Sequence, residues 1–212
     1  MQPSTRLQTP LVFVLYGLMA VAAASQQVPD DAADVRPLAV GDRAPAFEAP
    51  APDGGLYAFR PDELERPAIL IFYRGGWCPY CNGHLAELRD AVPRLQDAGY
   101  DVLFLSADRP ARLRASLEEP DLDYRLLSDA SMAIARDWGI AFRVDDETAE
   151  RYRSVGIDLA AASGYDHQQL PVPSVFLVDG GGFVRFRYVN PDYRERLSAE
   201  ALLEAAGIGS GD

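Results

Sequence analysis

The sequence is short of several residue types on which protein chemistry often depends. Its 212 residues include no lysine, since all 20 basic residues are arginine, and this excludes catalysis through a lysine Schiff base. Two cysteines are too few for a disulfide-stabilised scaffold, and two histidines leave few ligands for a metal site. Positive charge is scarce as well. The net charge of −12 argues against binding to nucleic acid or to anionic lipid, because both need excess positive charge.

The residues that are present have the composition of a folded globular chain. With 48% hydrophobic and 25% charged residues, the sequence is unlike collagen, low-complexity or disordered proteins. Its length suits one domain with a hydrophobic core. Neither an internal repeat nor a linker is visible after residue 40, so residues 41–212 are expected to form one α/β domain.

The first 24 residues differ from the rest of the chain. A single charged residue, Arg6, is followed by an unbroken apolar stretch over residues 11–24 and by small residues that allow cleavage. This pattern predicts a signal peptide over residues 1–24, followed by a flexible lead-in over residues 25–40 that is rich in Asp, Ala and Pro. A membrane anchor is the alternative, but the stretch is shorter than the roughly 20 residues that span a bilayer. We therefore expect export to the periplasm or the extracellular space, an oxidising compartment, with no membrane attachment after cleavage.

Strands and helices alternate along the rest of the chain. Pro-Asp-Gly-Gly at residues 52–55 separates two apolar stretches and predicts a β-hairpin over residues 47–59. The apolar run over residues 68–73 is typical of a buried central strand. Further strands are expected at residues 101–106, 124–127, 174–179 and 183–189, and helices at residues 79–98 with a kink at Pro93, 109–119, 130–138, 148–154 and 198–206.

Both cysteines lie where the apolar strand passes into the next helix, in the sequence Trp77-Cys78-Pro79-Tyr80-Cys81. At a helix N-terminus the free amides and the helix dipole favour negative charge, so the thiolate of Cys78 is stabilised and becomes nucleophilic. Pro79 suits the first helical turn, where its missing N–H costs nothing. Cys81 lies one turn further on the same face. It can therefore attack whatever Cys78 has formed, whether a mixed disulfide or a sulfenic acid.

Three other uses of this cysteine pair are considered. Zinc binding would need His84 and His167 as further ligands, although zinc knuckles rarely start from a buried strand. Covalent haem attachment needs histidine directly after the second cysteine, where this sequence has Asn82. A structural disulfide closing so short a loop would restrict the unfolded chain little. Redox chemistry is the best account, with His84 expected as a solvated helix residue or, alternatively, as a group that tunes Cys81.

A second feature lies much later in the chain. Pro173 directly precedes the apolar run over residues 174–179, where a proline is out of place without a special turn. Trp-Cys-x-x-Cys after one strand and Val-Pro-Ser before another resemble the thioredoxin fold. The opening Val-Gly-Asp-Arg-Ala-Pro-Ala-Phe at residues 40–47, with its Asp-Gly hairpin, is similar to the peroxiredoxin-like branch of that fold, the AhpC/TSA redoxins. The resemblance covers residues 40–206. It implies an α/β, thioredoxin-like fold with a central mixed sheet flanked by helices and an N-terminal β-hairpin extension.

The resemblance also bears on the residues around the cysteines. It implies that Pro173 forms a cis peptide bond beside the active site, with a trans turn proline as the alternative. Peroxiredoxins carry a proline, a threonine and an arginine at positions that here hold Ile71, Gly75 and Pro173, so none of the three matches. Arg74 is a candidate substitute for the positive charge that a peroxidase needs, against a surface arginine or a salt bridge. Two aromatic residues complete the expected thiolate environment: Trp77, which shields the thiol or fills a surface hollow, and Tyr80, exposed to partner proteins.

The cysteine pair and the resemblance together predict a peroxiredoxin-like thiol oxidoreductase. It would use the Cys78/Cys81 couple to reduce a small hydroperoxide or disulfide, and a thioredoxin-like thiol donor or a membrane reductase would restore the thiols. Neither a metal nor a cofactor beyond the redox-active disulfide is expected. One alternative is a glutaredoxin-like or thioredoxin-like thiol–disulfide oxidoreductase without peroxidase activity. Two others, from different classes, are a zinc-binding module and a redox-inert interaction domain of the thioredoxin fold.

Overall fold

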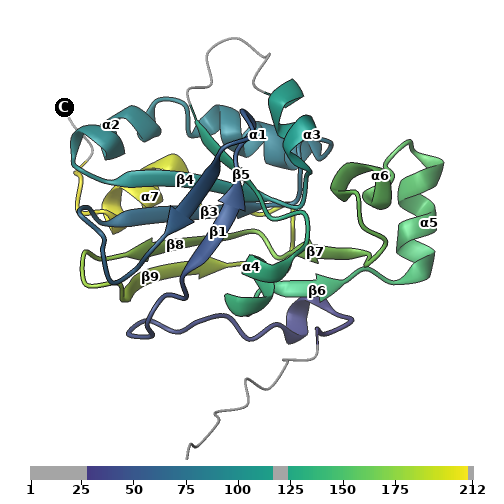
Figure 1. Cartoon of the computed structure of the whole chain (residues 1–212), viewed down its shortest axis with the longest axis horizontal. Helices are drawn as coiled ribbons and strands as arrows, with labels where there is room; N and C mark the ends of the chain where they lie inside the picture. Colours follow the sequence, from purple (N-terminus) through teal and green to yellow (C-terminus); the bar gives the residue numbers. More distant parts are fainter. Residues whose placement is uncertain (1–27, 117–123, 210–212) are drawn as a thin grey trace, which may run out of the picture.

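A computed structural model of the chain describes residues 28–116 and 124–209. Its centre is a five-stranded sheet with helices packed on it, which confirms the α/β fold class with a central mixed sheet (Figure 1). The expected signal peptide over residues 1–24 lies outside the described residues. None of the helices in the described part of the chain is long and apolar enough to cross a membrane.

The sheet has the strand order β5-β4-β3-β8-β9. Its central strand, β3 (Ala68–Tyr73), is buried along its whole length and runs parallel to β4 (Asp101–Ser106), which in turn is parallel to β5 (Arg125–Ser128). On the other side, β3 pairs antiparallel with β8 (Ser174–Val178), and β8 forms a hairpin with β9 (Val184–Val189). A strand between two neighbours, with both faces covered, can be apolar throughout, and this explains the continuous apolar runs of β3 and β8.

One face of the sheet is covered by the N-terminal hairpin and a short helix. The hairpin strands β1 (Phe47–Pro50) and β2 (Leu56–Phe59) pair antiparallel, which confirms the turn predicted from Pro-Asp-Gly-Gly. The helix α4 (Ala133–Asp137) leads into Trp138, a fully buried residue whose ring centroid lies 4.9 Å from that of Phe176 on β8. These elements share one hydrophobic cluster with the sheet.

The opposite face holds the second hydrophobic cluster, and both cysteines belong to it. Ile69 and Ile71 of β3 share this cluster with leucines from the helices above them, whereas Leu70 and Phe72 belong to the first cluster, so alternate side chains of β3 serve the two faces of the sheet. The helices on this face are α1 (Pro79–Glu87), α2 (Ala91–Asp97), α3 (Pro110–Ser116) and α7 (Ala199–Ala205). The cysteine pair is therefore built into the core rather than mounted on a surface loop.

The predicted helix over residues 79–98 is wrong in one respect, because the chain forms two helices there, α1 and α2. In the interior of one long helix, Pro93 could not donate to the carbonyl of Arg89, and its ring would clash with that carbonyl. The chain breaks at residues 88–90 instead, so that Pro93 falls in the first turn of α2, where its missing N–H has no helical partner to lose.

A smaller extension projects at one end of the molecule (Figure 1). Its strands β6 (Ala141–Arg143) and β7 (Gln169–Pro171) pair antiparallel, and the helices α5 (Asp146–Ser154) and α6 (Leu159–Ser163) lie between them in the chain. The sequence predicts the helix over residues 148–154 but neither the strand pair nor α6. Strands of three residues carry too little periodicity to be recognised.

The segment expected as a flexible lead-in makes defined contacts with the domain from residue 28 onward. The carbonyl of Pro29 accepts a hydrogen bond from the backbone N–H of Arg143 at 2.8 Å, and the N–H of Leu38 donates to the carbonyl of Trp138 at 3.3 Å. A short 3₁₀ helix over Ala32–Asp34 lies between these contacts. The described part of the lead-in thus runs along β6 and the end of α4.

Candidate active site

Cys78 lies at the N-terminus of α1, where a tight loop joins that helix to the end of β3. It is the N-cap residue, and its carbonyl accepts hydrogen bonds from the N–H groups of Cys81 at 3.0 Å and Asn82 at 3.1 Å. Pro79 occupies the first helical position, as the sequence predicts. The preceding Gly75 has a φ of +151°, and a Cβ there would lie 2.3 Å from the Nε1 of Trp77. The loop that aims Cys78 into the core therefore requires glycine at residue 75.

The two cysteines form a buried thiol pair. Cys78 is 2% exposed and Cys81 is 1% exposed, and both are free thiols. A hydrogen bond from the Cys81 thiol lowers the pKa of Cys78, against the opposing effect of burial and with further help from the charge of Arg74. The same hydrogen bond, together with burial, raises the pKa of Cys81. The two shifts run in opposite directions and make Cys78 the more acidic thiol of the pair.

Arg74 is buried beside the nucleophile. Its side chain is 3% exposed, and its Nη1 donates toward the Sγ of Cys78 at 3.9 Å. The guanidinium carbon lies 4.2 Å from the ring centroid of Tyr193, 5.1 Å from that of Trp77 and 5.3 Å from that of Tyr152, and its Nη2 donates to the Tyr152 hydroxyl. Among the described residues it forms no salt bridge. Arg74 is therefore neither a surface arginine nor half of an ion pair, and its charge faces the thiolate and three aromatic rings.

Asp108 fixes the loop from the neighbouring strand. It follows β4, and because parallel strands end at the same edge of a sheet, its side chain reaches the loop that follows β3. Its Oδ2 accepts a hydrogen bond from the N–H of Gly76 at 2.7 Å, whereas its Oδ1 is buried and has no hydrogen-bond partner among the described residues. Burial raises the pKa of Asp108 to about 6, although the hydrogen bond from Gly76 opposes the shift. The sequence offers one signal for this residue: Ser-Ala-Asp directly after an apolar strand parallel to β3.

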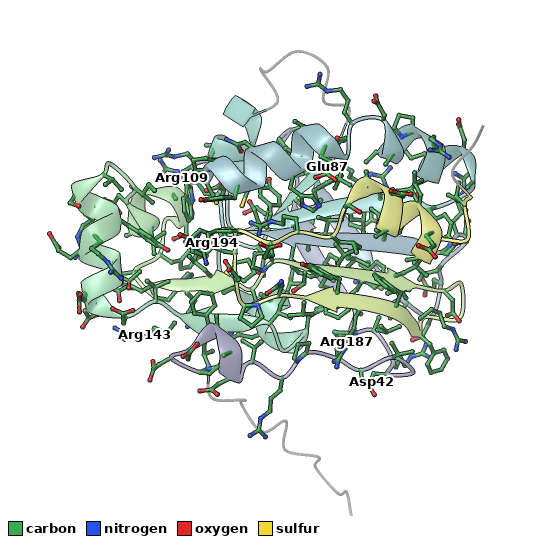
Figure 2. All side chains as sticks on the ribbon, turned by 180° about the vertical axis from the view of Figure 1, so that it is seen from behind. Asp42, Glu87, Arg109, Arg143, Arg187 and Arg194 are labelled. Atoms are coloured by element: carbon green, nitrogen blue, oxygen red, sulfur yellow. The ribbon has the colours of Figure 1, made fainter. Side chains whose placement is uncertain are left out.

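A second arginine contacts the second cysteine. Arg196 lies on the loop between β9 and α7, and its Nη2 is 3.6 Å from the Sγ of Cys81. The same loop supplies Tyr193, which packs edge-on against Tyr80 with ring centroids 5.6 Å apart. Figure 2 shows Arg194 on this loop, where its exposed side chain pairs with Asp192 instead. No motif or spacing marks Arg196, because its approach to Cys81 depends on how the C-terminal loop folds back over α1.

Comparison with known protein families settles what kind of chain carries this site. The family model of the AhpC/TSA family matches residues 40–187. The chain belongs to the AhpC/TSA family. It is 33% identical over 106 residues to peroxiredoxin Bcp of Escherichia coli (strain K12), a match that covers 50% of this chain and 67% of that protein. Chloroplastic peroxiredoxin Q of Suaeda salsa is 26% identical over 171 residues, which cover 79% of this chain and 68% of that protein.

Solved peroxiredoxin structures share the fold of this AhpC/TSA protein. Peroxidoxin BcpB from Mycobacterium tuberculosis superposes with a TM-score of 0.59 at 20% identity, covering 79% of this chain and 94% of that one. The reduced 2-Cys peroxiredoxin of Plasmodium vivax gives a TM-score of 0.60 at 19% identity and covers 81% of each chain. These findings confirm the thioredoxin-like fold and the peroxiredoxin-like family. The protein is accordingly a thiol-dependent oxidoreductase of the peroxiredoxin type.

The remaining expectations about the site have mixed outcomes in this AhpC/TSA protein. The cis peptide bond expected at Pro173 is wrong, since the Val172–Pro173 bond is trans. The trans form lets the chain continue extended from β7 into β8, where the N–H of Val172 donates to the carbonyl of Ile140 at 2.8 Å. The register that pairs Phe72 with Ser174 still brings the buried Pro173 to the end of β3, beside the cysteine loop.

The aromatic residues lie where the sequence places them, whereas His84 does not lie in solvent. Trp77 is partly buried with its ring centroid 6.2 Å from that of Tyr152, and Tyr80 is 48% exposed. His84, expected in solvent, is buried at 6% exposure, and its Nε2 binds the carbonyl of Leu197 at 3.0 Å. Burial lowers the pKa of His84, so its ring is held neutral as an anchor for the C-terminal loop.

The geometry required for a zinc site does not occur around the cysteines. His167 lies just before β7, where its Nε2 donates to the carbonyl of Ala130 at 2.9 Å and its Nδ1 accepts from the N–H of Gln169. Within residues 28–116 and 124–209, no group of three or more His, Cys, Asp or Glu side chains is arranged to hold a metal ion.

Proposed function

We propose that this protein is a thiol peroxidase in which Cys78 reduces a small hydroperoxide and Cys81 resolves the product. The observation that carries the proposal is the buried guanidinium of Arg74 beside the Cys78 sulfur. A peroxidase must stabilise a thiolate and then the negative charge that develops on the leaving oxygen as the O–O bond breaks. Arg74 can serve both needs, because it faces Cys78 without a competing carboxylate among the described residues.

The proposed catalytic cycle has three steps. The Cys78 thiolate attacks the distal oxygen of the hydroperoxide, forming an S–O bond as the O–O bond breaks, and the departing alkoxide or hydroxide takes a proton to leave as alcohol or water. The Cys81 sulfur then attacks the sulfenic acid on Cys78, forming the disulfide and releasing water. Two thiols of a donor protein finally reduce the disulfide by exchange, and the donor leaves oxidised.

Burial of both sulfurs favours a hydroperoxide over a protein disulfide. With Cys78 at 2% exposure, a bulky disulfide could reach the nucleophile only after neighbouring side chains moved away. A peroxide of two oxygen atoms needs a far smaller opening. The rings around the Arg74 guanidinium beside Cys78 are those of Tyr152, Tyr193 and Trp77, and each comes from a different segment of the structure.

We also propose the donor and the location. A thioredoxin-like protein is the natural donor, and export through residues 1–24 would make the relevant donor one of the periplasmic or extracellular space, or a membrane reductase. One observation favours a second candidate function, thiol–disulfide exchange without peroxidase activity. Tyr80 and Tyr193 form an exposed aromatic pair beside the cysteines, where a partner protein could dock.

Single-cysteine variants test the proposal. Reduced protein is mixed with hydrogen peroxide, and sulfenic acid and disulfide are followed by dimedone trapping and mass spectrometry. We expect Cys78→Ser to abolish peroxide consumption, and Cys81→Ser to consume one equivalent and accumulate sulfenic acid on Cys78. A wild-type rate no faster than that of a free thiol would refute the peroxidase. If a small-molecule or protein disulfide oxidised the pair rapidly in the same protein, the second candidate would replace it.

A further inference from the structure

Arg196 occupies a place for which the structure gives no packing reason. Its side chain is partly buried, and its Nη1 binds the carbonyls of Tyr193 and, at 2.9 Å, Glu195 on its own loop. These contacts fix the guanidinium and leave its Nη2 directed at Cys81 Sγ, 3.6 Å away. It forms no salt bridge within the described residues, and its Nε is buried there without a hydrogen-bond partner. An arginine held this way stabilises negative charge on the Cys81 sulfur that its Nη2 faces.

A second donor approaches the same sulfur. The backbone of Arg74 forms a hydrogen bond to Cys81, so the Cys81 sulfur has two donors nearby, that backbone group and the Arg196 guanidinium. In the reduced pair the two donors face no negative charge on Cys81, because the Cys81 thiol keeps its proton in the hydrogen bond to Cys78. Once Cys78 has become a sulfenic acid, that thiolate is gone. Both donors then face a sulfur that must lose its proton before it can attack.

We propose that Arg196 is a catalytic residue of the resolving step, where it stabilises Cys81 as a thiolate for attack on the sulfenic acid of Cys78. The proposal rests on the proposed function, in which Cys81 is the resolving cysteine. In this step the Cys81 S–H proton passes to the hydroxyl that leaves the Cys78 sulfur as water. An S–S bond forms as the S–O bond breaks, so atoms and charge balance without a further reactant. The two cysteines thereby have one arginine each, Arg74 for attack and Arg196 for resolution.

The titration of Cys81 tests this without any peroxide. In the Cys78→Ser background Cys81 is the only thiol of the chain, and ¹³C labelling of cysteine gives one Cβ signal whose shift reports its ionisation. Adding Arg196→Met should raise the pKa of Cys81 by about one unit or more, as expected for losing a hydrogen bond to a charged group. The matched control is Arg194→Met on the same loop, whose side chain is 61% exposed and pairs with Asp192.

Three other titratable groups lie close enough to Arg196 for its charge to affect their pKa values, so the experiment must account for their ionisation. They are Cys78, which the background variant removes, His84 and Asp192. Substituting Asp192→Asn alongside separates its contribution. An unchanged Cys81 titration in Arg196→Met, or an equal change in Arg194→Met, would overturn the proposal. Should Arg196→Met fail to fold, Arg196→Gln and Arg196→Lys decide: only Lys should retain a lowered pKa of Cys81, and equal titrations in the two would overturn it.

Single-turnover kinetics with both cysteines present supply the functional readout. In Arg196→Met, formation of sulfenic acid should change by no more than about threefold, because Arg74 is the nearer cation to Cys78, whereas disulfide formation should slow roughly 10- to 100-fold. Equal slowing of both steps would mean that Arg196 acts on the fold or on Cys78, and would overturn the proposal. If wild-type protein forms no sulfenic acid at all, the proposed peroxidase function fails, while the Cys81 titration still decides the role of Arg196.

Discussion

Replacing Arg74 with methionine should slow the reaction of Cys78 with peroxide. Methionine keeps an unbranched apolar stem between the rings of Trp77 and Tyr193, so the change removes the charge and its hydrogen bonds with little loss of packing. The group lost is a cation at 3.9 Å from the sulfur. The effect should therefore be electrostatic, and it should appear in the ionisation of Cys78 as well as in its reaction rate.

The expected magnitude follows from the position of the charge. Two unit charges about 4 Å apart attract by about 4 kcal/mol at an effective dielectric constant of about 20, which sets an upper limit. A hydrogen bond to a charged group contributes about 1.5–3 kcal/mol net, since the isolated groups regain solvation. Loss of that amount raises the pKa of Cys78, about 6 in the wild type, by about one to two units, so the thiolate fraction at pH 7 should fall about two- to tenfold. Loss of the charge that faces the leaving oxygen should lower the rate further, to roughly 10- to 100-fold below that of the wild type.

The assay is stopped-flow mixing of reduced protein with hydrogen peroxide across pH 5 to about 9, with fluorescence of the nearby Trp77 as the signal. The direction of the expected shift follows from the pKa. Because Arg74 lowers the pKa of Cys78, its removal must move the pH at which the reaction rate rises to a higher value. Arg74→Lys should fall between the two proteins, as it keeps charge but loses the planar contacts. The control is Arg185→Met, whose residue pairs with Asp179 at the opposite end of the sheet. A rate within about twofold of wild type and an unshifted pH profile in Arg74→Met would refute the reasoning.

Two further predictions concern the loop before Cys78. Gly75→Ala should lose about 1–3 kcal/mol of stability and react more slowly with peroxide, because its Cβ would meet Trp77 Nε1 at 2.3 Å and the Asp108 carboxylate at 2.9 Å. Gly83→Ala, a helical position with open space around it, is the control and should gain up to about 1 kcal/mol in chemical denaturation. Asp108→Asn should become more stable relative to wild type as the pH rises. Burial raises the folded pKa of Asp108 to about 6, above its unfolded value, so wild type loses stability between about pH 4 and pH 6 that the variant keeps. The difference between the two proteins should change by up to about 3 kcal/mol between pH 4 and pH 8, and a pH-independent difference would contradict the burial argument.

The strands and the cysteine loop were predictable because their signals are local. The runs over residues 68–73 and 101–106 match β3 and β4 residue for residue, since only a strand covered on both faces is apolar throughout. The Asp-Gly turn fixed the first hairpin, and Ser198 caps α7 by accepting a hydrogen bond from the N–H of Ala201. The single helix expected over residues 79–98 is wrong because a proline can stand in the first turn of a new helix. Sequence spacing alone does not distinguish such a break from a kink within one helix.

The environment of the cysteines was predictable only in part, because it is made by contacts between distant segments. Arg74 could be singled out by its place before Cys78, but its burial depends on Tyr152 and Tyr193, which reach it from α5 and from the loop before α7. Charged residues are rarely buried without an ion pair, so the sequence favours a surface position for arginine. Arg196 carries no local signal at all. Its contact with Cys81 exists because the last helix packs against α1 and α2.

In the proposed function, the two arginines take the place of the proline, threonine and arginine expected around a peroxiredoxin nucleophile. The negative charge in the proposed cycle moves from Cys78 to the leaving oxygen and then to Cys81, so no single donor can face it throughout. Arg74 is placed for the first two positions and Arg196 for the third. In a buried site each cation must be held before the charge arrives, because reorganising it during the reaction would add to the barrier. Aromatic rings hold Arg74 and backbone carbonyls hold Arg196, and neither restraint neutralises the charge that it positions.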